Sequence, residues 1–224
     1  MGQCYGVTFT HPSAFLLDFS HSSYIGCRPT VFADVPLPAR YMAFSTQCVG
    51  SGPQGRIPLL ARCTVVDYRG QVVYDYYVQP IAPVTNYFTA TTGLTASLPD
   101  GALTLAQAQA DITQQLLNKI VVGHELHNSL SSVGVPHRTI DTRDVGLYLP
   151  FRAALGYQDT VPLPVLCSQL MRRTIQYNGV FDPIEDARAA MDLFRTHEDT
   201  WEASIASGVW LCCLPPPSFA PYLL

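Results

Sequence analysis

The sequence predicts an α/β fold, and three observations lead to it. First, three β-rich runs stand early in the chain, at residues 41–48, 59–67 and 71–79. Second, an amphipathic helical pattern at residues 104–116 is followed by a short apolar strand at residues 120–123. Third, a strong helix start stands at Asp182. Strands and helices combined in this way predict a mixed sheet flanked by helices.

Local signals mark the individual elements. The turn Tyr68-Arg69-Gly70 separates the second and third runs and predicts a hairpin. Thr104 opens the amphipathic helix with a capping box. Asp182 is followed by Pro183, which suits the first helical position because no N–H donor is needed there. We therefore expect helices to begin at Thr104 and at Asp182.

Length and composition indicate one packed domain with appendages. The chain has 224 residues, 48% of them hydrophobic, and this apolar content supports a core rather than disorder. Its net charge of −4 excludes a global field that would draw it onto nucleic acid, and Lys119 is its one lysine. Arg172 and Arg173 form the one adjacent basic pair, which is read either as a solvated helix face or as a phosphate contact.

The cysteines and the hydropathy pattern bear on location. Seven cysteines show no C-x-x-C pair and no secreted-scaffold spacing, which indicates reduced thiols in an intracellular protein, nuclear or cytoplasmic. No apolar run reaches the roughly 18 residues of a membrane span, and no signal-peptide pattern is visible. We expect no membrane association.

Four segments carry a resemblance to a known family. They are Tyr41–Gly50 (YMAFSTQCVG), Val84–Thr95 (VTNYFTATTGLT), Gly123–Leu130 (GHELHNSL) and Phe181–Met191 (FDPIEDARAAM). In this order they resemble the DEDDh 3′–5′ exonucleases, in the RNA exonuclease 4-like and interferon-stimulated exonuclease-like branch. The resemblance covers about residues 40 to 197. It implies an RNase H-like fold, a mixed five-stranded sheet flanked by helices.

The resemblance also implies where the active site would lie. In that family four carboxylates hold two divalent metal ions and a histidine acts as general base. Ser45, Gln47 and Ser129 stand at three of the carboxylate places in this chain, Asp186 keeps the fourth, and Phe181 stands where the histidine would be. The site is therefore expected to be degenerate, with no intact catalytic residue. Magnesium and manganese are not expected to bind well there, because neutral oxygens cannot balance their charge.

Other residues near these motifs are candidates for contact with RNA or a partner. Phe88 replaces an arginine of the family loop, which removes a phosphate contact. His124 and His127 lie at helical spacing i, i+3, but two histidines alone are short of the four ligands that a structural zinc needs. Asp144 is expected to pair with an arginine or the backbone. The contact candidates are Phe88, Thr89, His124, His127, Asn128, Arg172 and Arg173.

Extensions flank the exonuclease-like domain, which we place at residues 39–200. Residues 1–38 resemble a degenerate C2H2 finger and form an irregular N-terminal extension. Its remaining ligand types, Cys4, His21 and Cys27, are too few for the tetrahedral zinc of a finger, so zinc is not expected. Residues 201–224 form an apolar C-terminal tail, expected to pack on the domain or on a partner.

These observations predict a pseudonuclease, an exonuclease fold without catalysis, in RNA metabolism or RNA silencing. Two roles stay open: a protein-interaction scaffold, which the apolar extensions favour, and a module that binds single-stranded RNA. The alternative is an active metal-dependent 3′–5′ RNA exonuclease with a rebuilt site. A protein partner is expected, and the sequence leaves its identity and the oligomeric state open.

Overall fold

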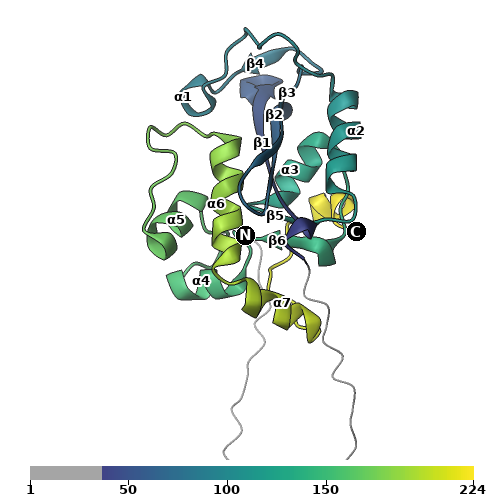
Figure 1. Ribbon diagram of the computed structural model, residues 1–224. Coiled ribbons are helices and arrows are strands. Elements are labelled where there is room, and N and C mark those ends of the chain that lie inside the picture. Colours follow the sequence, from purple (N-terminus) through teal and green to yellow (C-terminus); the bar gives the residue numbers. More distant parts are fainter. Residues whose placement is uncertain (1–36) are drawn as a thin grey trace, which may run out of the picture. The chain divides into compact units, whose positions relative to one another are not determined.

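A computed structural model describes residues 37–224 of the chain. The finger-like extension, with Cys4, His21 and Cys27, lies outside the described residues. Within them the chain forms a mixed sheet with helices on both faces, which confirms the predicted α/β class (Figure 1).

The sheet has six strands, one more than predicted. They are β1 (Tyr41–Ser51), β2 (Ile57–Asp67), β3 (Val72–Tyr77), β4 (Val84–Asn86), β5 (Ile120–Gly123) and β6 (Thr142–Asp144). Along the sheet the order is β3-β2-β1-β5-β6. Strand β2 pairs antiparallel with both β1 and β3, whereas β5 pairs parallel with β1, and β6 pairs parallel with β5. The additional strand, β4, pairs with the end of β1 at Gly50 and Ser51, in a segment expected to be a loop.

Seven α-helices are present in residues 37–224. They are α1 (Thr89–Thr92), α2 (Leu105–Leu116), α3 (Leu126–Val133), α4 (Leu149–Leu155), α5 (Leu163–Met171), α6 (Pro183–Arg195) and α7 (Glu198–Ala206). Short 3₁₀ turns are η1 (Pro38–Arg40), η2 (Pro53–Gly55), η3 (Thr139–Asp141) and η4 (Pro217–Tyr222). None of these helices combines the length and apolar character that crossing a bilayer requires.

The two faces of the sheet bury separate cores because side chains alternate along β1. Ala43 belongs to the core under α4, α5, α6 and α7, whereas Phe44 belongs to the core under α2 and α3. Figure 1 shows α6 and α2 on opposite sides of the central strands. Helix α6 packs on β1, β2 and β5, and this packing positions the helix against the middle of the sheet.

The predicted helix starts are confirmed in atomic detail. Thr104 accepts from the main-chain N–H of Gln107, whose side chain accepts from the N–H of Thr104 in return, a reciprocal capping box. Asp182 caps α6 by accepting from the N–H of Ile184 at 3.0 Å, and Pro183 stands at the first helical position.

The C-terminal residues pack on the domain. The indole ring of Trp201 is fully buried and stacks on Tyr148 with ring centroids 3.7 Å apart. The boundary expected between residues 200 and 201 thus falls inside α7. Further on, η4 packs against α3, and the last residue, Leu224, exchanges main-chain hydrogen bonds with His137 and Thr139. This pairing holds the end of the chain beside the segment that follows α3.

Candidate functional site

A cleft of about 580 Å³ opens beside β1, between the starts of α3 and α6 and the C-terminal turn η4. Four of the five positions singled out in the sequence line it: Ser45, Ser129, Phe181 and Asp186. The other lining residues are Phe44, Thr46, Cys48, Pro58, His124, Glu125, Asn128, Ser131, Ser132, Thr160, Pro162, Leu163, Pro164, Gln176 and Phe219. The fold therefore brings the predicted positions together although they come from three distant segments.

Asp186 is the retained carboxylate, and its side chain already has a protein partner. The side-chain amide of Gln176 donates to Asp186 Oδ1 at 2.8 Å. Burial raises the pKa of Asp186 to about 6, and the Gln176 hydrogen bond opposes that rise only in part. A raised pKa means that the cleft disfavours negative charge at this carboxyl group.

Hydroxyl groups occupy the opposite wall. Thr46 Oγ1 donates to Ser129 Oγ at 3.2 Å, and Ser132 Oγ lies 2.9 Å from the main-chain oxygen of Ser129 and 3.3 Å from Thr46 Oγ1. Cys48 lies in the same wall, where burial raises the pKa of its thiol and so keeps it protonated. This wall is thus polar but uncharged.

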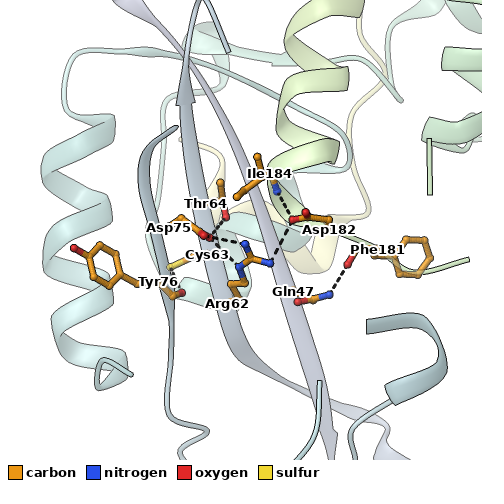
Figure 2. Close-up of polar contacts among 9 residues, drawn as sticks. All are labelled: Gln47, Arg62, Cys63, Thr64, Asp75, Tyr76, Phe181, Asp182 and Ile184. Atoms are coloured by element: carbon orange, nitrogen blue, oxygen red, sulfur yellow. Dashed lines mark hydrogen bonds and ion pairs between the residues drawn. The ribbon is translucent and has the colours of Figure 1, made fainter. Parts of the chain in front are cut away.

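Gln47 is buried, and its side-chain amide is bound to the protein itself rather than free to hold a metal ion (Figure 2). Its Nε2 donates to the main-chain oxygen of Thr92 at 2.8 Å and to that of Phe181 at 2.6 Å. We call these two contacts the Gln47 bridge. They join β1 to α1 and to the segment that precedes α6. A carboxylate at this position has no N–H to donate and would face two carbonyl oxygens.

Arg62 lies opposite Gln47 on the neighbouring strand β2, and it also contacts the residue that begins α6. Its guanidinium donates to both oxygens of Asp75, at 2.9 and 2.8 Å, and lies 3.3 Å from Asp182 Oδ1 (Figure 2). Because Asp182 also caps α6, Arg62 connects β3, β2 and the first turn of α6. The N-terminus of α6 is therefore positioned by polar contacts within the protein.

Asp144 and the two histidines behave as structural groups. Asp144 accepts from the main-chain N–H groups of Glu125, Leu126 and Gly146 at 2.8–3.1 Å, in keeping with the expected backbone partner. His124 Nε2 lies 2.7 Å from the main-chain oxygen of Val161. His127 instead packs edge-on against Phe219, with ring centroids 4.7 Å apart. The two imidazoles thus have different partners.

The remaining contact candidates divide by position. Asn128 lines the cleft together with His124, whereas the others do not. Phe88 adopts a left-handed φ of 50° at the start of α1, and the hydroxyl of Thr89 donates to the main-chain oxygen of Leu94. Arg172 ends α5 with a left-handed φ of 53°, and Arg173 pairs with Asp192 at 2.6 Å.

Several lining residues lie outside the family segments, and two of them, Phe219 and Gln176, make specific contacts at the cleft. Phe219 belongs to the tail beyond the family motifs, and Gln176 stands in the loop between α5 and α6. Gln176 also donates its main-chain N–H to Glu185 at 2.8 Å, so the loop is bound to α6 at two points. Only the tertiary structure brings these two side chains to the cleft.

The donor set does not fit a pair of divalent cations. Of the family's metal-binding positions, Ser45 and Ser129 offer neutral hydroxyls, and the amide of Gln47 is committed to main-chain oxygens. Asp186 alone supplies charge. Within residues 37–224, no group of three or more His, Cys, Asp or Glu side chains is arranged to hold a metal ion.

Proteins of known name are similar to most of this chain. The human apoptosis-enhancing nuclease is 37% identical over 184 residues, which are 80% of this chain and 56% of that protein. RNA exonuclease 4 of Debaryomyces hansenii is 34% identical over 168 residues, 75% of this chain and 61% of that protein. The human interferon-stimulated 20 kDa exonuclease-like 2 is 33% identical over 177 residues, 78% and 50% of the two chains. The chain belongs to a DEDDh-type exonuclease family.

Membership in this family confirms the resemblance read from the motifs. The chain spans about half the length of the curated relatives it matches. No protein-family model matches it.

Solved structures also share the fold of this chain. The Saccharomyces cerevisiae Pan2 pseudoubiquitin hydrolase-RNA exonuclease module, in complex with A7 RNA, matches with a TM-score of 0.63 and 21% identity, over 78% of this chain and 31% of that one. The Neurospora crassa Pan2 catalytic unit matches with a TM-score of 0.59 and 22% identity, over 80% and 29%. At these identities the likeness establishes the fold alone, and it confirms the RNase H-like architecture.

Proposed function

We propose that this exonuclease-like domain is a pseudonuclease that holds single-stranded RNA in its cleft without hydrolysing it. The observation that carries the proposal is the Gln47 bridge. A side chain that would hold a cation in an active relative here donates hydrogen bonds to two main-chain oxygens. The cleft thus keeps its form through contacts that need no cation.

Hydrolysis by two metals needs anionic oxygens that hold the ions and a base that receives the proton of water. Asp186 alone cannot balance two dications, and the neutral oxygens of Ser45 and Ser129 add no charge. Phe181 has no group that accepts a proton, and general-base assistance is typically worth about 10²- to 10⁴-fold in rate. Three metal-binding carboxylates and the general base are missing, so we infer that the site does not hydrolyse RNA.

Binding of RNA is supported by the relatives and by the absence of three carboxylates at the family positions. Similar proteins are named as exonucleases, and the Pan2 modules of the same fold form complexes with RNA. Loss of three carboxylates at the family positions also removes repulsion toward a phosphate backbone. We place this function in RNA metabolism or RNA silencing.

A second candidate is a protein-interaction scaffold. The observation that favours it is the exposed apolar surface of the C-terminal segment, where Leu214 is 76% exposed and Val209 is 50% exposed. Large exposed apolar side chains are common in surfaces that dock partners. We place either role inside the cell, nuclear or cytoplasmic, because the five cysteines in residues 37–224 are unpaired.

Three measurements on the full chain test the proposal together. Titration calorimetry with MnCl₂ and MgCl₂ is expected to give no binding heat, and a labelled single-stranded RNA is expected to stay uncut with either ion. The same RNA is expected to bind in a mobility-shift assay. Trimming that depends on divalent ions and is abolished by Asp186→Ala would establish the alternative, an active exonuclease with a rebuilt site. Absence of RNA binding, together with capture of one defined protein, would favour the scaffold.

A further inference from the structure

Resting on the proposed function, we propose that the cleft takes the uncharged part of a terminal RNA nucleoside, its base and ribose, and leaves the phosphates outside. The rings of Phe181 and Phe219 would contact the faces of the base, and the hydroxyl wall would contact its polar edge and the ribose. This makes the C-terminal turn η4 part of the binding site.

The charge of the lining residues supports a neutral ligand group. No arginine or lysine is among the side chains that line the cleft, and two carboxylates are, Glu125 and Asp186. A phosphate inside would therefore meet negative groups and no cation.

Two aromatic rings reach the cleft from different parts of the chain. Phe181 precedes α6 and is 43% exposed, so its ring is available to a ligand. Phe219 reaches the cleft from η4 and is supported by the edge-on contact with His127. Stacking of a base on an aromatic side chain is worth about 1–3 kcal/mol per base and tolerates any base.

Main-chain hydrogen bonds hold the backbone segments that carry both rings. The N–H of Phe181 donates to the oxygen of Thr91 at 2.7 Å, and its own oxygen accepts from Gln47. The turn that carries Phe219 is secured where Leu224 and Tyr222 pair with His137. A ligand therefore does not need to order the main chain that carries these rings, which reduces the entropic cost of binding.

The polar groups and the size of the cleft suit a nucleoside. Uncharged donors and acceptors are contributed by Ser45, Thr46, Asn128, Ser129, Ser131, Ser132 and Thr160. A hydroxyl both donates and accepts, so this wall can satisfy ribose hydroxyls and base edges of either polarity. The volume of about 580 Å³ lies within the usual range for small-molecule sites, which is about 300–1,000 Å³.

The test is label-free calorimetry on the full chain with a single-stranded RNA of about six nucleotides, within the usual site size. The RNA is used with hydroxyl groups at both ends, and again with phosphates at both ends. We expect the phosphorylated RNA to bind at least about tenfold more weakly. Between about 50 and 200 mM salt, affinity for the hydroxyl form should fall by less than about tenfold, far less than the 10³-fold or greater loss typical of many phosphate contacts. Free adenosine is expected to compete, which would show that the nucleoside itself is recognised.

Variants then test whether each of the two rings contributes to RNA binding. Phe181→Leu and Phe219→Leu keep apolar volume but lose the aromatic face, and each is expected to weaken binding about 5- to 100-fold. Tyr177→Leu is the matched control, because Tyr177 is 87% exposed, is not among the lining residues and lies only four positions from Phe181. It should bind as the parent does. Melting temperatures of all variants establish that they are folded.

The outcomes distinguish failure of the nucleoside site from failure of the proposed function, RNA binding. If the parent chain binds neither RNA, the proposed function fails. If it binds RNA but the two Phe→Leu variants bind equally well, or terminal phosphates make no difference, the nucleoside site is wrong while RNA binding stands. If adenosine does not compete at any concentration reached, recognition of the nucleoside is likewise refuted.

Discussion

The side-chain amide of Gln47 donates to the main-chain oxygen of Phe181 over 2.6 Å, linking residues 134 positions apart in the chain. Its second hydrogen bond, to Thr92, completes the Gln47 bridge. The residue before α6 is thus held against β1 by the protein itself. The same two positions would be a metal ligand and a general base in an intact member of the family.

Gln47→Glu is expected to destabilise the fold by about 1–3 kcal/mol above the pKa of the new carboxyl group, because a buried carboxylate would face two carbonyl oxygens. That environment raises the pKa of the glutamate in the folded state. Stability should therefore be lost as pH rises, since the unfolded chain releases the proton more readily. Urea denaturation at about pH 5 and about pH 8 measures this. Gln114→Glu, at an exposed position of α2, serves as control; an equal loss in both variants would contradict the role of the bridge.

Returning two carboxylates to the cleft should create a cation site. Ser45→Asp with Ser129→Asp places two carboxylates in the same cleft as Asp186, and three hard anionic ligands suit manganese or magnesium. Calorimetry with MnCl₂ is expected to show binding in this variant. RNA should still not be trimmed, because Phe181 supplies no base. The double change Ser168→Asp with Ser207→Asp adds the same charge at exposed sites outside the cleft; manganese binding there too would show that net charge alone is responsible.

The ion pair of Arg143 and Glu202 connects β6 to α7 in the buried interior, with N···O distances of 2.6 and 2.9 Å. Glu202→Gln is expected to cost about 3–5 kcal/mol, because it leaves a buried guanidinium without its counter-charge. Replacing both partners, Arg143→Met with Glu202→Leu, should cost less than the single change. Urea denaturation measures the difference, with the exposed Asp199→Asn on the same helix as control. A free energy of unfolding that is lower in the double variant than in Glu202→Gln would contradict this explanation.

Acid is expected to loosen the C-terminal turn that contributes Phe219. Burial lowers the pKa of His127 and of His137, and both contact this part of the chain. Asp144 and Glu125 act on His127 in the opposite direction, and His124 acts with burial. Because both folded pKa values lie below those of the unfolded chain, unfolding takes up protons and stability falls as pH drops through about 6.5.

Hydrogen exchange of the amides of residues 219–224 checks this at about pH 7 and about pH 5, after correction for the intrinsic pH dependence of exchange. Protection is expected to decrease at the lower pH in the parent and less so in His127→Gln, which cannot titrate there. Equal protection at both pH values would show that the histidines do not control this turn.

Much of the fold could be predicted because it follows from local pattern. The helix start at Asp182 and the capping box at Thr104 were readable from a few adjacent residues, and both are present. Strand β4 was missed, since its three residues show no periodicity and pair with β1 only through an irregular register. A segment of that length becomes a strand through its neighbour rather than through its own composition.

The candidate site was predictable in part for the same reason. Ser45, Ser129, Phe181 and Asp186 stand in motifs, so their convergence on one cleft could be expected. The Gln47 bridge could not, because its acceptors are main-chain oxygens, which every residue carries and no sequence pattern marks. Phe219 was out of reach as well, since only the folding of the tail onto α3 brings it to the cleft.

The Gln47 bridge also bears on whether this chain could evolve back toward a hydrolase. A first reversion at Gln47 would surrender two hydrogen bonds before any neighbouring position regained a charge that could use the new carboxylate. Reversion elsewhere first would add a charge to the cleft and still leave the proton acceptor absent at Phe181. No intermediate on either path would gain hydrolytic activity, and the one that begins at Gln47 would also lose stability, so selection would have nothing to favour along the way.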